Sequence, residues 1–318
     1  MRGGAGDRGR RTVEHLIREL QPDLVWVQHV SGAGLNADHY RRWRSQGNFA
    51  VIYQESDPYG RWRNRLPREA VIAGQAADIV FTSGSGTFAS NFRRHGAKDV
   101  RWLSQGYDPG SFKRDRTIEP ASDVVVVANR GVSRVPWRGH SGAKQRETAI
   151  RLLQRYFGDR LALYGHGWDG PGVRGPVPFW DQGRAIQSGW VSANWDHYPD
   201  EPHYFSNRLP ISLATGGVHV TNWHPGYEGF FPLEEGFLKV ATDPEQLVDT
   251  VDGFLAATSR DERRELADKG AAWSEGHMSQ YALTEQVVRS AFPAFPAAVP
   301  RGLVSKVRAV VEHHPSDW

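Results

Sequence analysis

The sequence lacks cysteine altogether, so disulfide bonds and thiolate metal sites are excluded. It also lacks a long apolar run, and its mean hydropathy of -0.56 argues against a membrane-spanning helix. Residues 1–11 are rich in glycine and arginine and do not show the basic-then-apolar order of a secretion signal. These absences favour a cytoplasmic protein, and we expect a bacterial or viral setting.

Several catalytic signatures are absent as well. The sequence contains no G-x-S-x-G, H-E-x-x-H or G-x-x-x-x-G-K-[ST] pattern. The polar residues Asp196, His197, Asp200 and His203 do not have the spacing of a known metal site. Serine hydrolases, zinc proteases and P-loop enzymes therefore find no support, and we expect no metal requirement.

Basic residues are grouped although the net charge is only +3. Arginines alternate with tryptophan in residues 41–44 and again in residues 61–65. Such groups suit an anionic partner, and a solvated helix face with a loop of stacked guanidinium groups is the alternative interpretation.

The length of 318 residues favours two α/β domains, because one hydrophobic core rarely organises that many residues. The first part of the chain alternates helix and strand patterns, which predicts a mostly parallel sheet with helices on both faces. The expected helices are 12–20, 38–46, 68–77 and 90–95, and the expected strands are 24–27, 49–53, 79–82 and 100–103.

A polar stretch without periodicity, 108–122, is the expected linker. We therefore place the first domain at residues 1–115, the second at 116–292, and a tail at 293–318 that packs back across the hinge. In the second domain we expect strands at 124–127, 161–164, 218–221 and 237–240, helices at 144–156, 207–214, 244–256, 261–273 and 279–291, a loop at 165–178, and an element that starts at 185–188.

Seven segments together carry a resemblance to a known family. Four lie in the second domain and three in the first: 124–130 with Arg146, LALYGHGW (161–168), NRLPISLATGG (207–217), EGFFPLEEGFLKVATDPEQL (228–247), VIYQESDP (51–58), DIVFT (78–82) and GAKDVRWLSQGYDPGSF (96–112). In this order they resemble the CgeB-like (spore-maturation-type) branch of the group 1 GT-B glycosyltransferases. The resemblance spans most of residues 12–290 and implies two Rossmann-like domains that face each other across a cleft.

The resemblance implies that the second domain binds a nucleotide-sugar, UDP- or GDP-linked, and that no other cofactor is needed. Helix N-termini, backbone N–H groups and arginines suit its diphosphate. For Gly216 and Gly217 a plain helix-to-strand turn is an equal alternative. The expected donor-binding residues are Arg130, Arg146, Gly165, Trp168, Asn207, Arg208, Gly216, Gly217, Asn222, His224, Gly226, Tyr227 and Glu228.

Two residues at strand ends of the first domain are the expected catalytic residues. Asp57 matches the family's Asp-Pro position and is expected to contact the acceptor or act as base, with an Asp-Pro turn as the alternative. His29 is expected to orient the acceptor or the donor phosphate, unless it is structural. Arg44, Arg61 and Arg63 are expected to bind an anionic acceptor, such as a glycan or teichoic-acid-like polymer, a phospholipid surface, or modified DNA in a viral setting.

The sequence departs from the family pattern in two places. Ile211 and His203 stand where many relatives carry carboxylates, so the ribose contact falls to Glu228, Glu234 or Glu235, the donor differs, or activity is lost. The first domain also starts without the family's first strands, which implies a trimmed form, a wrong start or a different sheet. A non-catalytic glycan- or nucleic-acid-binding module on the same scaffold is therefore the alternative function.

Overall fold

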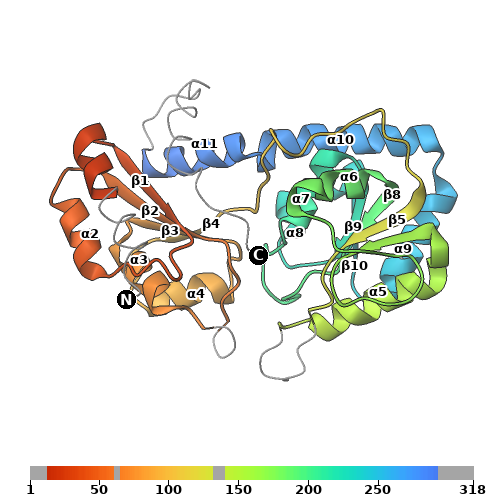
Figure 1. The fold of residues 1–318 in the computed structure, drawn as a ribbon, viewed down its shortest axis with the longest axis horizontal. Coiled ribbons are helices and arrows are strands. Elements are labelled where there is room, and N and C mark those ends of the chain that lie inside the picture. Colours follow the sequence, from red (N-terminus) through yellow and green to blue (C-terminus); the bar gives the residue numbers. More distant parts are fainter. Residues whose placement is uncertain (1–12, 61–64, 132–139, 293–318) are drawn as a thin grey trace.

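The computed structural model describes residues 13–60, 65–131 and 140–292, which form two α/β domains side by side (Figure 1). The first domain contains a four-stranded parallel sheet in the order β1-β2-β3-β4. Its strands are β1 (Leu24–Gln28), β2 (Ala50–Glu55), β3 (Ile79–Thr82) and β4 (Val100–Trp102), and its helices are α2 (Ala37–Arg44), α3 (Arg68–Ala76) and α4 (Thr87–Arg94), with residues 13–20 also helical.

The second domain contains a six-stranded parallel sheet in the order β10-β9-β8-β5-β6-β7. Its strands are β5 (Ser122–Val127), β6 (Leu161–Tyr164), β7 (Val173–Gly175), β8 (Gly189–Ala193), β9 (Val218–Asn222) and β10 (Leu238–Ala241). Its helices are α5 (Ala143–Phe157), α6 (Gln182–Gln187), α7 (Arg208–Thr215), α8 (Tyr227–Phe230), α9 (Pro244–Ala257) and α10 (Arg260–Met278), with short 3-10 helices at Gly158–Arg160, Phe179–Asp181 and Leu233–Glu235.

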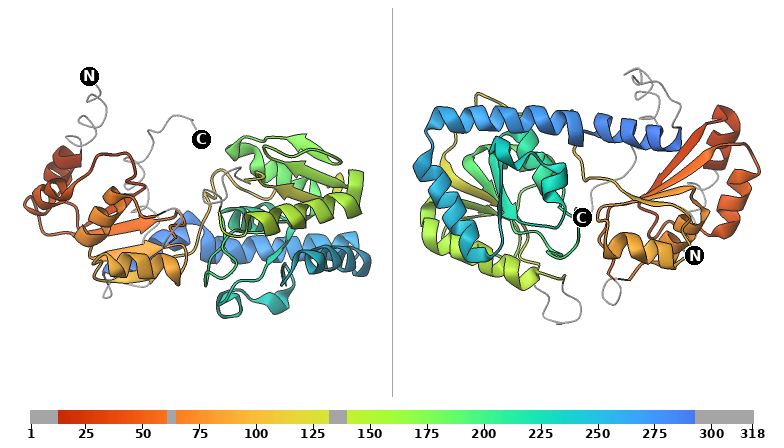
Figure 2. Two further views of the ribbon diagram at one scale, coloured as in Figure 1. Left: turned by 90° about the horizontal axis from the view of Figure 1, so that it is seen from below. Right: turned by 180° about the vertical axis from the view of Figure 1, so that it is seen from behind.

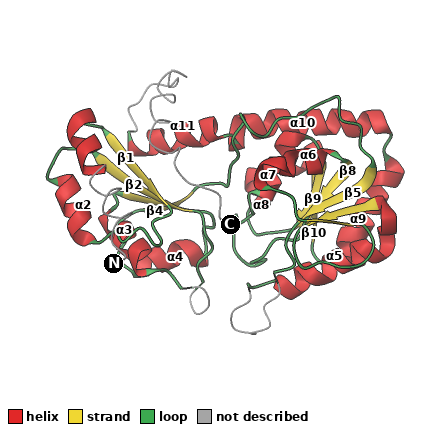
Figure 3. Ribbon diagram, viewed as in Figure 1, coloured by secondary structure: helices red, strands yellow, loops and turns green. Residues whose placement is uncertain are grey.

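Helices cover both faces of the second sheet (Figure 3). One face packs on α5 and α9 through Ile150, Leu153, Leu247 and Val251, which are all fully buried. The other face packs on α6 and α7, with Leu209 and Ile211 inside. The central strands β5 and β6 contain continuous apolar runs, as expected for strands that are covered on both faces.

The last described helix, α11 (Gln280–Ala291), leaves the second domain and packs on the first (Figures 1 and 2). Its residues Leu283 and Val287 are buried against Ile52 and Phe81 of the first sheet. The sequence analysis assigned this helix to the second domain because it follows that domain along the chain. The sequence pattern does not reveal which of the two sheets an amphipathic helix covers. The tail 293–318 lies outside the described residues.

Two strands differ from the sequence-based expectation. The segment 165–178 was expected to be a loop, but Val173–Gly175 forms the edge strand β7. Strand β8, Gly189–Ala193, was anticipated only as an unspecified element that starts before it. Both strands are short and begin or end with glycine, so their apolar patterns are weak. No helix of the described residues is long and apolar enough to cross a membrane.

Candidate active site

The carboxyl end of the second sheet holds the candidate site, between β5 and β8. These strands are neighbours, but the chain runs from β5 to β6 on one side and from β8 to β9 on the other. In open parallel sheets this reversal leaves a crevice in which ligands bind. The segments 128–131, 194–207 and 222–226 follow β5, β8 and β9 there.

A fully buried carboxylate, Asp196, lies at the centre of this region. It accepts hydrogen bonds from Asn194 Nδ2 at 2.7 Å and from the Ser206 N–H at 3.1 Å, and its own N–H donates to Asn222 Oδ1 at 2.6 Å. The guanidinium of Arg146, from α5, lies 3.6 Å away. Burial alone raises the pKa of Asp196, but the charge of Arg146 and the Ser206 hydrogen bond hold it below its usual value, so the carboxylate is ionised.

Arg146 forms the ion pair with this buried carboxylate, and a second arginine, Arg208, lies close enough to Arg146 for their charges to repel each other. Arg146 is 4% exposed and donates from Nε to the Trp195 carbonyl at 2.5 Å. Burial and then the charge of Arg208 lower the pKa of Arg146 to about 10, so it stays charged at neutral pH. Arg208 begins α7, where the N-cap residue Asn207 makes no capping hydrogen bond. The second guanidinium therefore leaves the site with excess positive charge beside a helix N-terminus, which suits an anion.

Several buried polar atoms around this site have no hydrogen-bond partner among the described residues. They are Arg208 Nε, Ser206 Oγ, Asn194 Oδ1 and His197 Nδ1. Burial, followed by the charge of Arg146, lowers the pKa of His197 to about 3, so its ring is neutral. Folded proteins rarely leave such groups unpaired, and water or a ligand normally satisfies them.

The end of β9 and the segment that follows it place several polar side chains inside the protein. Asn222 and His224 are buried and lie 2.9 Å apart between side-chain nitrogens. Tyr227 is also buried, and its hydroxyl donates to the Tyr204 carbonyl at 3.0 Å. Gly226 has a φ of 91° and leaves no room for a Cβ beside the His203 ring, while Glu228 is exposed. Of the residues expected here to bind the donor, Asn222, His224 and Tyr227 are therefore buried and Glu228 is exposed.

The ends of β5 and β6 form the other side of the site. Gly165 has a φ of 142°, and a Cβ there would lie 2.0 Å from the Ala128 carbonyl oxygen. Trp168 is buried and donates from Nε1 to the same carbonyl at 2.6 Å. Arg130 is half-buried and forms an ion pair with Glu147. Gly165 and Trp168 thus hold the two strand ends together, and Arg130 lies at the rim.

Three expected binding residues lie away from this site. Gly216 ends α7 with a φ of 99°, and Gly217 precedes β9, so both lie at the amino end of the sheet and make a turn. Arg44 donates to the Phe49 carbonyl and to Asp78, both at 2.6 Å, just before β2 and β3 begin. It therefore lies at the amino end of the first sheet and supports the fold. Arg61 and Arg63 lie outside the described residues.

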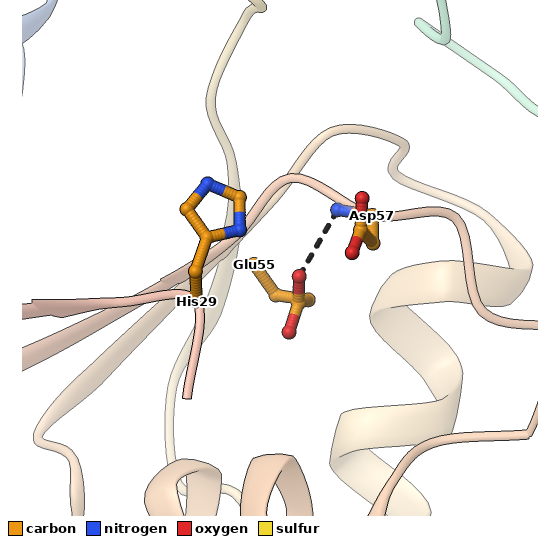
Figure 4. Close-up of side chains that lie close together, drawn as sticks. All are labelled: His29, Glu55 and Asp57. Atoms are coloured by element: carbon orange, nitrogen blue, oxygen red, sulfur yellow. Dashed lines mark hydrogen bonds between the residues drawn. The ribbon is translucent and has the colours of Figure 1, made fainter. Parts of the chain in front are cut away.

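The two expected catalytic residues lie together in the first domain, with a third residue that the sequence analysis missed (Figure 4). His29 follows β1 and Asp57 follows β2, and both are exposed. Between them is Glu55, which is 2% exposed, accepts from the Asp57 N–H at 3.0 Å and is bonded to the Tyr53 hydroxyl. Among the described residues this is the one group with His and carboxylate atoms close enough to hold a metal ion.

A carboxylate of the second domain joins the two domains. Glu201 accepts hydrogen bonds from the N–H groups of Gly86, Thr87 and Phe88, at 2.8, 2.8 and 3.3 Å, at the start of α4. His203 Nδ1 lies 2.8 Å from Ser85 Oγ. The carboxyl end of the first sheet, where His29 and Asp57 lie, therefore faces the second domain.

The sequence analysis missed Glu55, Asn194, Asp196 and Glu201 as site residues. Asp196 was considered only as a metal ligand, and its neighbours do not have the spacing of a metal site. The polar residues that follow residue 193 could have indicated this site. Polar residues directly after a buried strand often lie at the carboxyl end of a parallel sheet, where ligands bind. Since β8 was not anticipated, that signal could not be used.

Comparisons with known proteins agree with this architecture. Residues 144–285 match the family described as glycosyl transferase-like. No curated protein matches the sequence.

Solved structures share the fold over most of their length. Sucrose-phosphate synthase from Thermosynechococcus elongatus is 14% identical with a TM-score of 0.57, over 91% of this chain and 78% of that one. HepE from Anabaena, in complex with UDP and glucose, is 12% identical with a TM-score of 0.56, over 91% and 83%. A glycosyltransferase from Rickettsia africae is 10% identical with a TM-score of 0.57, over 94% and 85%.

These findings confirm the expected fold, two facing α/β domains of the GT-B type. At such low identity the solved structures establish the fold, and the family match covers most of the second domain. The chain therefore has the GT-B fold, and residues 144–285 of its second domain match the glycosyl transferase-like family.

Proposed function

We propose that this protein transfers a sugar from a nucleoside-diphosphate sugar to an acceptor hydroxyl, and that Arg208 binds the donor diphosphate. The observation that carries the proposal is the excess positive charge near Asp196, because Arg146 is already paired with this carboxylate and the nearby charge of Arg208 is not paired with it. A diphosphate brings the negative charge that this arrangement lacks. The unpartnered Arg208 Nε and Ser206 Oγ add donors at the same place.

The remaining donor contacts follow from the same geometry. Arg146 acts through Asp196 and the Trp195 carbonyl, because it is too buried to meet a ligand directly. The backbone of the loop 222–226 and the exposed Glu228 lie beside the site and are our candidates for the ribose. UDP is the first nucleotide to test, since HepE from Anabaena was solved with it. The segments quoted above further support placement in the CgeB-like branch.

The acceptor side of the reaction falls to the first domain. Asp57 and His29 lie at strand ends that face the second domain, where an acceptor hydroxyl would meet the sugar. Asp57 is our candidate for the acceptor contact or base, and His29 for its orientation. Stabilisation of the departing diphosphate by Arg208 needs no metal ion at the donor.

A non-catalytic binding module is the second candidate. Ile211 is 1% exposed in the core, and His203 bonds Ser85, so neither position supplies a carboxylate to the site. This module would bind a glycan or nucleic acid without binding a nucleotide-sugar, and nucleotide binding separates the two functions.

The test is a thermal-shift screen against UDP, GDP, ADP, CMP, dTDP and their sugars. A nucleotide at 100 times its dissociation constant should stabilise the chain by about 2.7 kcal/mol. In Arg208→Ala we expect the affinity to fall about ten- to a hundredfold, because a charge-assisted hydrogen bond contributes about 1.5–3 kcal/mol.

Arg160→Ala is the matched control. Arg160 pairs with Asp123 at 2.8 Å at the amino end of the sheet, so this variant should bind like the wild type. Equal binding by Arg208→Ala would remove Arg208 from the donor site. A chain that no nucleotide stabilises would favour the binding module.

A further inference from the structure

We propose that His29, Glu55 and Asp57 bind one divalent transition-metal ion, Mn²⁺ or Zn²⁺, at the carboxyl end of the first sheet. This proposal departs from the sequence-based expectation that no metal is needed. The binding itself does not depend on the proposed function; only its role in holding the acceptor does.

The fold brings these three side chains together from two neighbouring strands. Gln28 and Gln54 are register partners in β1 and β2, so the next residues, His29 and Glu55, are neighbours as well. Asp57 lies two residues beyond Glu55, and its N–H donates to Glu55 Oε1 at 3.0 Å. One ligand atom from each residue lies within 4.8 Å of the other two, and the groups surround a common space (Figure 4).

The charge of the group supports a cation. Glu55 is 2% exposed, and its two partners, the Tyr53 hydroxyl and the Asp57 N–H, are both neutral donors. Two described arginines near the amino end of this sheet, Arg44 and Arg101, pair with Asp78 and Asp99, so their charges do not compensate the two carboxylates. A buried carboxylate without a cation is unfavourable, and a metal ion shared with Asp57 and His29 removes this cost.

The backbone of the loop that follows His29 is held in a fixed position, as a metal-binding residue requires. The loop after β1 is fixed by Glu69, whose carboxylate accepts from the Gly32 and Gly34 N–H groups at 2.6 and 2.9 Å. His29 itself has a φ of 47°. The His29 and Asp57 side chains are exposed and free to rotate to the spacing of about 3–4 Å that ligand atoms about 2.1 Å from one ion require.

The ligand types determine the class of metal. One imidazole with two carboxylates suits Mn²⁺, Zn²⁺ or a similar transition metal, whereas Mg²⁺ and Ca²⁺ prefer oxygen ligands alone. Three protein ligands leave coordination positions for an acceptor hydroxyl, which a metal ion makes more acidic. This ion would act on the acceptor and not on the donor diphosphate, and Asp57, as its ligand, would contact the acceptor through the ion and would not act as the base.

The experiment measures metal binding without turnover. The full chain without a histidine tag is stripped with EDTA and dialysed against MnCl₂ or ZnCl₂, and the bound metal is counted by mass spectrometry. We expect one ion per chain, and at least tenfold weaker binding in His29→Asn and in Asp57→Asn. Asparagine tolerates the positive φ of His29, and both side chains are exposed, so these variants should fold.

His15→Asn and Asp99→Asn are the matched controls, because both residues are exposed in the same domain and lie outside the group. Absence of binding by the wild type, or unchanged binding by both site variants, overturns the proposal. Nucleotide binding is measured separately in EDTA, so failure of the donor site and failure of the metal site are distinguishable.

Discussion

Single residues decide whether the second domain tolerates charge in its interior. Asp196 is fully buried, and Arg146 is its ionic partner at 3.6 Å. The pair keeps its charge because Asn194, Ser206 and the Trp195 carbonyl satisfy the remaining hydrogen-bonding groups. Removing one partner leaves the other charge buried without compensation.

We therefore predict that Asp196→Leu lowers the free energy of unfolding by about 3–5 kcal/mol, measured by urea denaturation. Arg146→Met should have a similar effect, and the double variant should lose less than the sum of both. Arg160→Met is the control, since its exposed pair with Asp123 contributes less than about 1 kcal/mol. Strict additivity of the two variants would show that the pair is not coupled.

A buried histidine in the second sheet, His219, makes the folding stability of the protein depend on pH. His219 of β9 is fully buried, and its Nδ1 lies 3.2 Å from Ser192 Oγ of β8. Burial lowers the pKa of His219 to about 4 from its ordinary value of 6.5. The unfolded chain therefore binds a proton at a higher pH than the folded chain does.

The difference in the pKa of His219 between the unfolded and the folded chain sets the direction in which stability changes with pH. The folded state should lose stability as the pH falls from about 6.5, and the loss from His219 should be complete near pH 4, at about 3 kcal/mol. Comparison with His219→Gln isolates this effect, because the carboxylates titrate in both proteins. We expect the variant to show a flatter pH dependence in urea unfolding, with His15→Gln like the wild type; parallel curves would contradict the low pKa of His219.

The relative position of the two domains rests on contacts between distant parts of the chain. The helices α10 and α11 run along both domains (Figure 2), and Glu201 caps the start of α4 in the first domain. Its contacts are close, since a Cβ on Gly84 or Gly86 would lie 2.6 Å from Glu201 or Pro202. Three N–H donors on one carboxylate favour the closed arrangement by about 1–3 kcal/mol.

Glu201→Ala should open the molecule while each domain stays folded. We expect a larger radius of gyration in X-ray scattering, lower turnover, and nucleotide binding within about twofold of the wild type, because the donor site lies in the second domain alone. Glu265→Ala, which removes an exposed carboxylate of α10 in the same domain, is the control. An unchanged radius of gyration would assign domain closure to α11 instead.

Much of the fold could be predicted from local pattern. The strands 79–82 and 161–164 were predicted with the bounds that the structure has, and most helices differ by a few residues at their ends. The GT-B fold followed from the order of these segments and is confirmed, and the match of residues 144–285 to the glycosyl transferase-like family agrees with the expected glycosyltransferase class. The positions of Asp57 and His29 at strand ends were also readable, because polar residues after an apolar run are visible locally.

The sequence by itself determined the alternation of strands and helices, because apolar spacing along the chain sets which faces must be buried. Only the tertiary structure decided that Asp196 shares its charge with Arg146, that Gly216 and Arg44 lie at the wrong ends of their sheets to meet a ligand, and that α11 covers the first domain. The first and the last of these facts depend on residues far apart in the chain, such as Asp196 with Arg146 and Leu283 with Ile52, that meet through packing. Such contacts leave no periodic signal in either segment, so they appear only when the whole chain is folded.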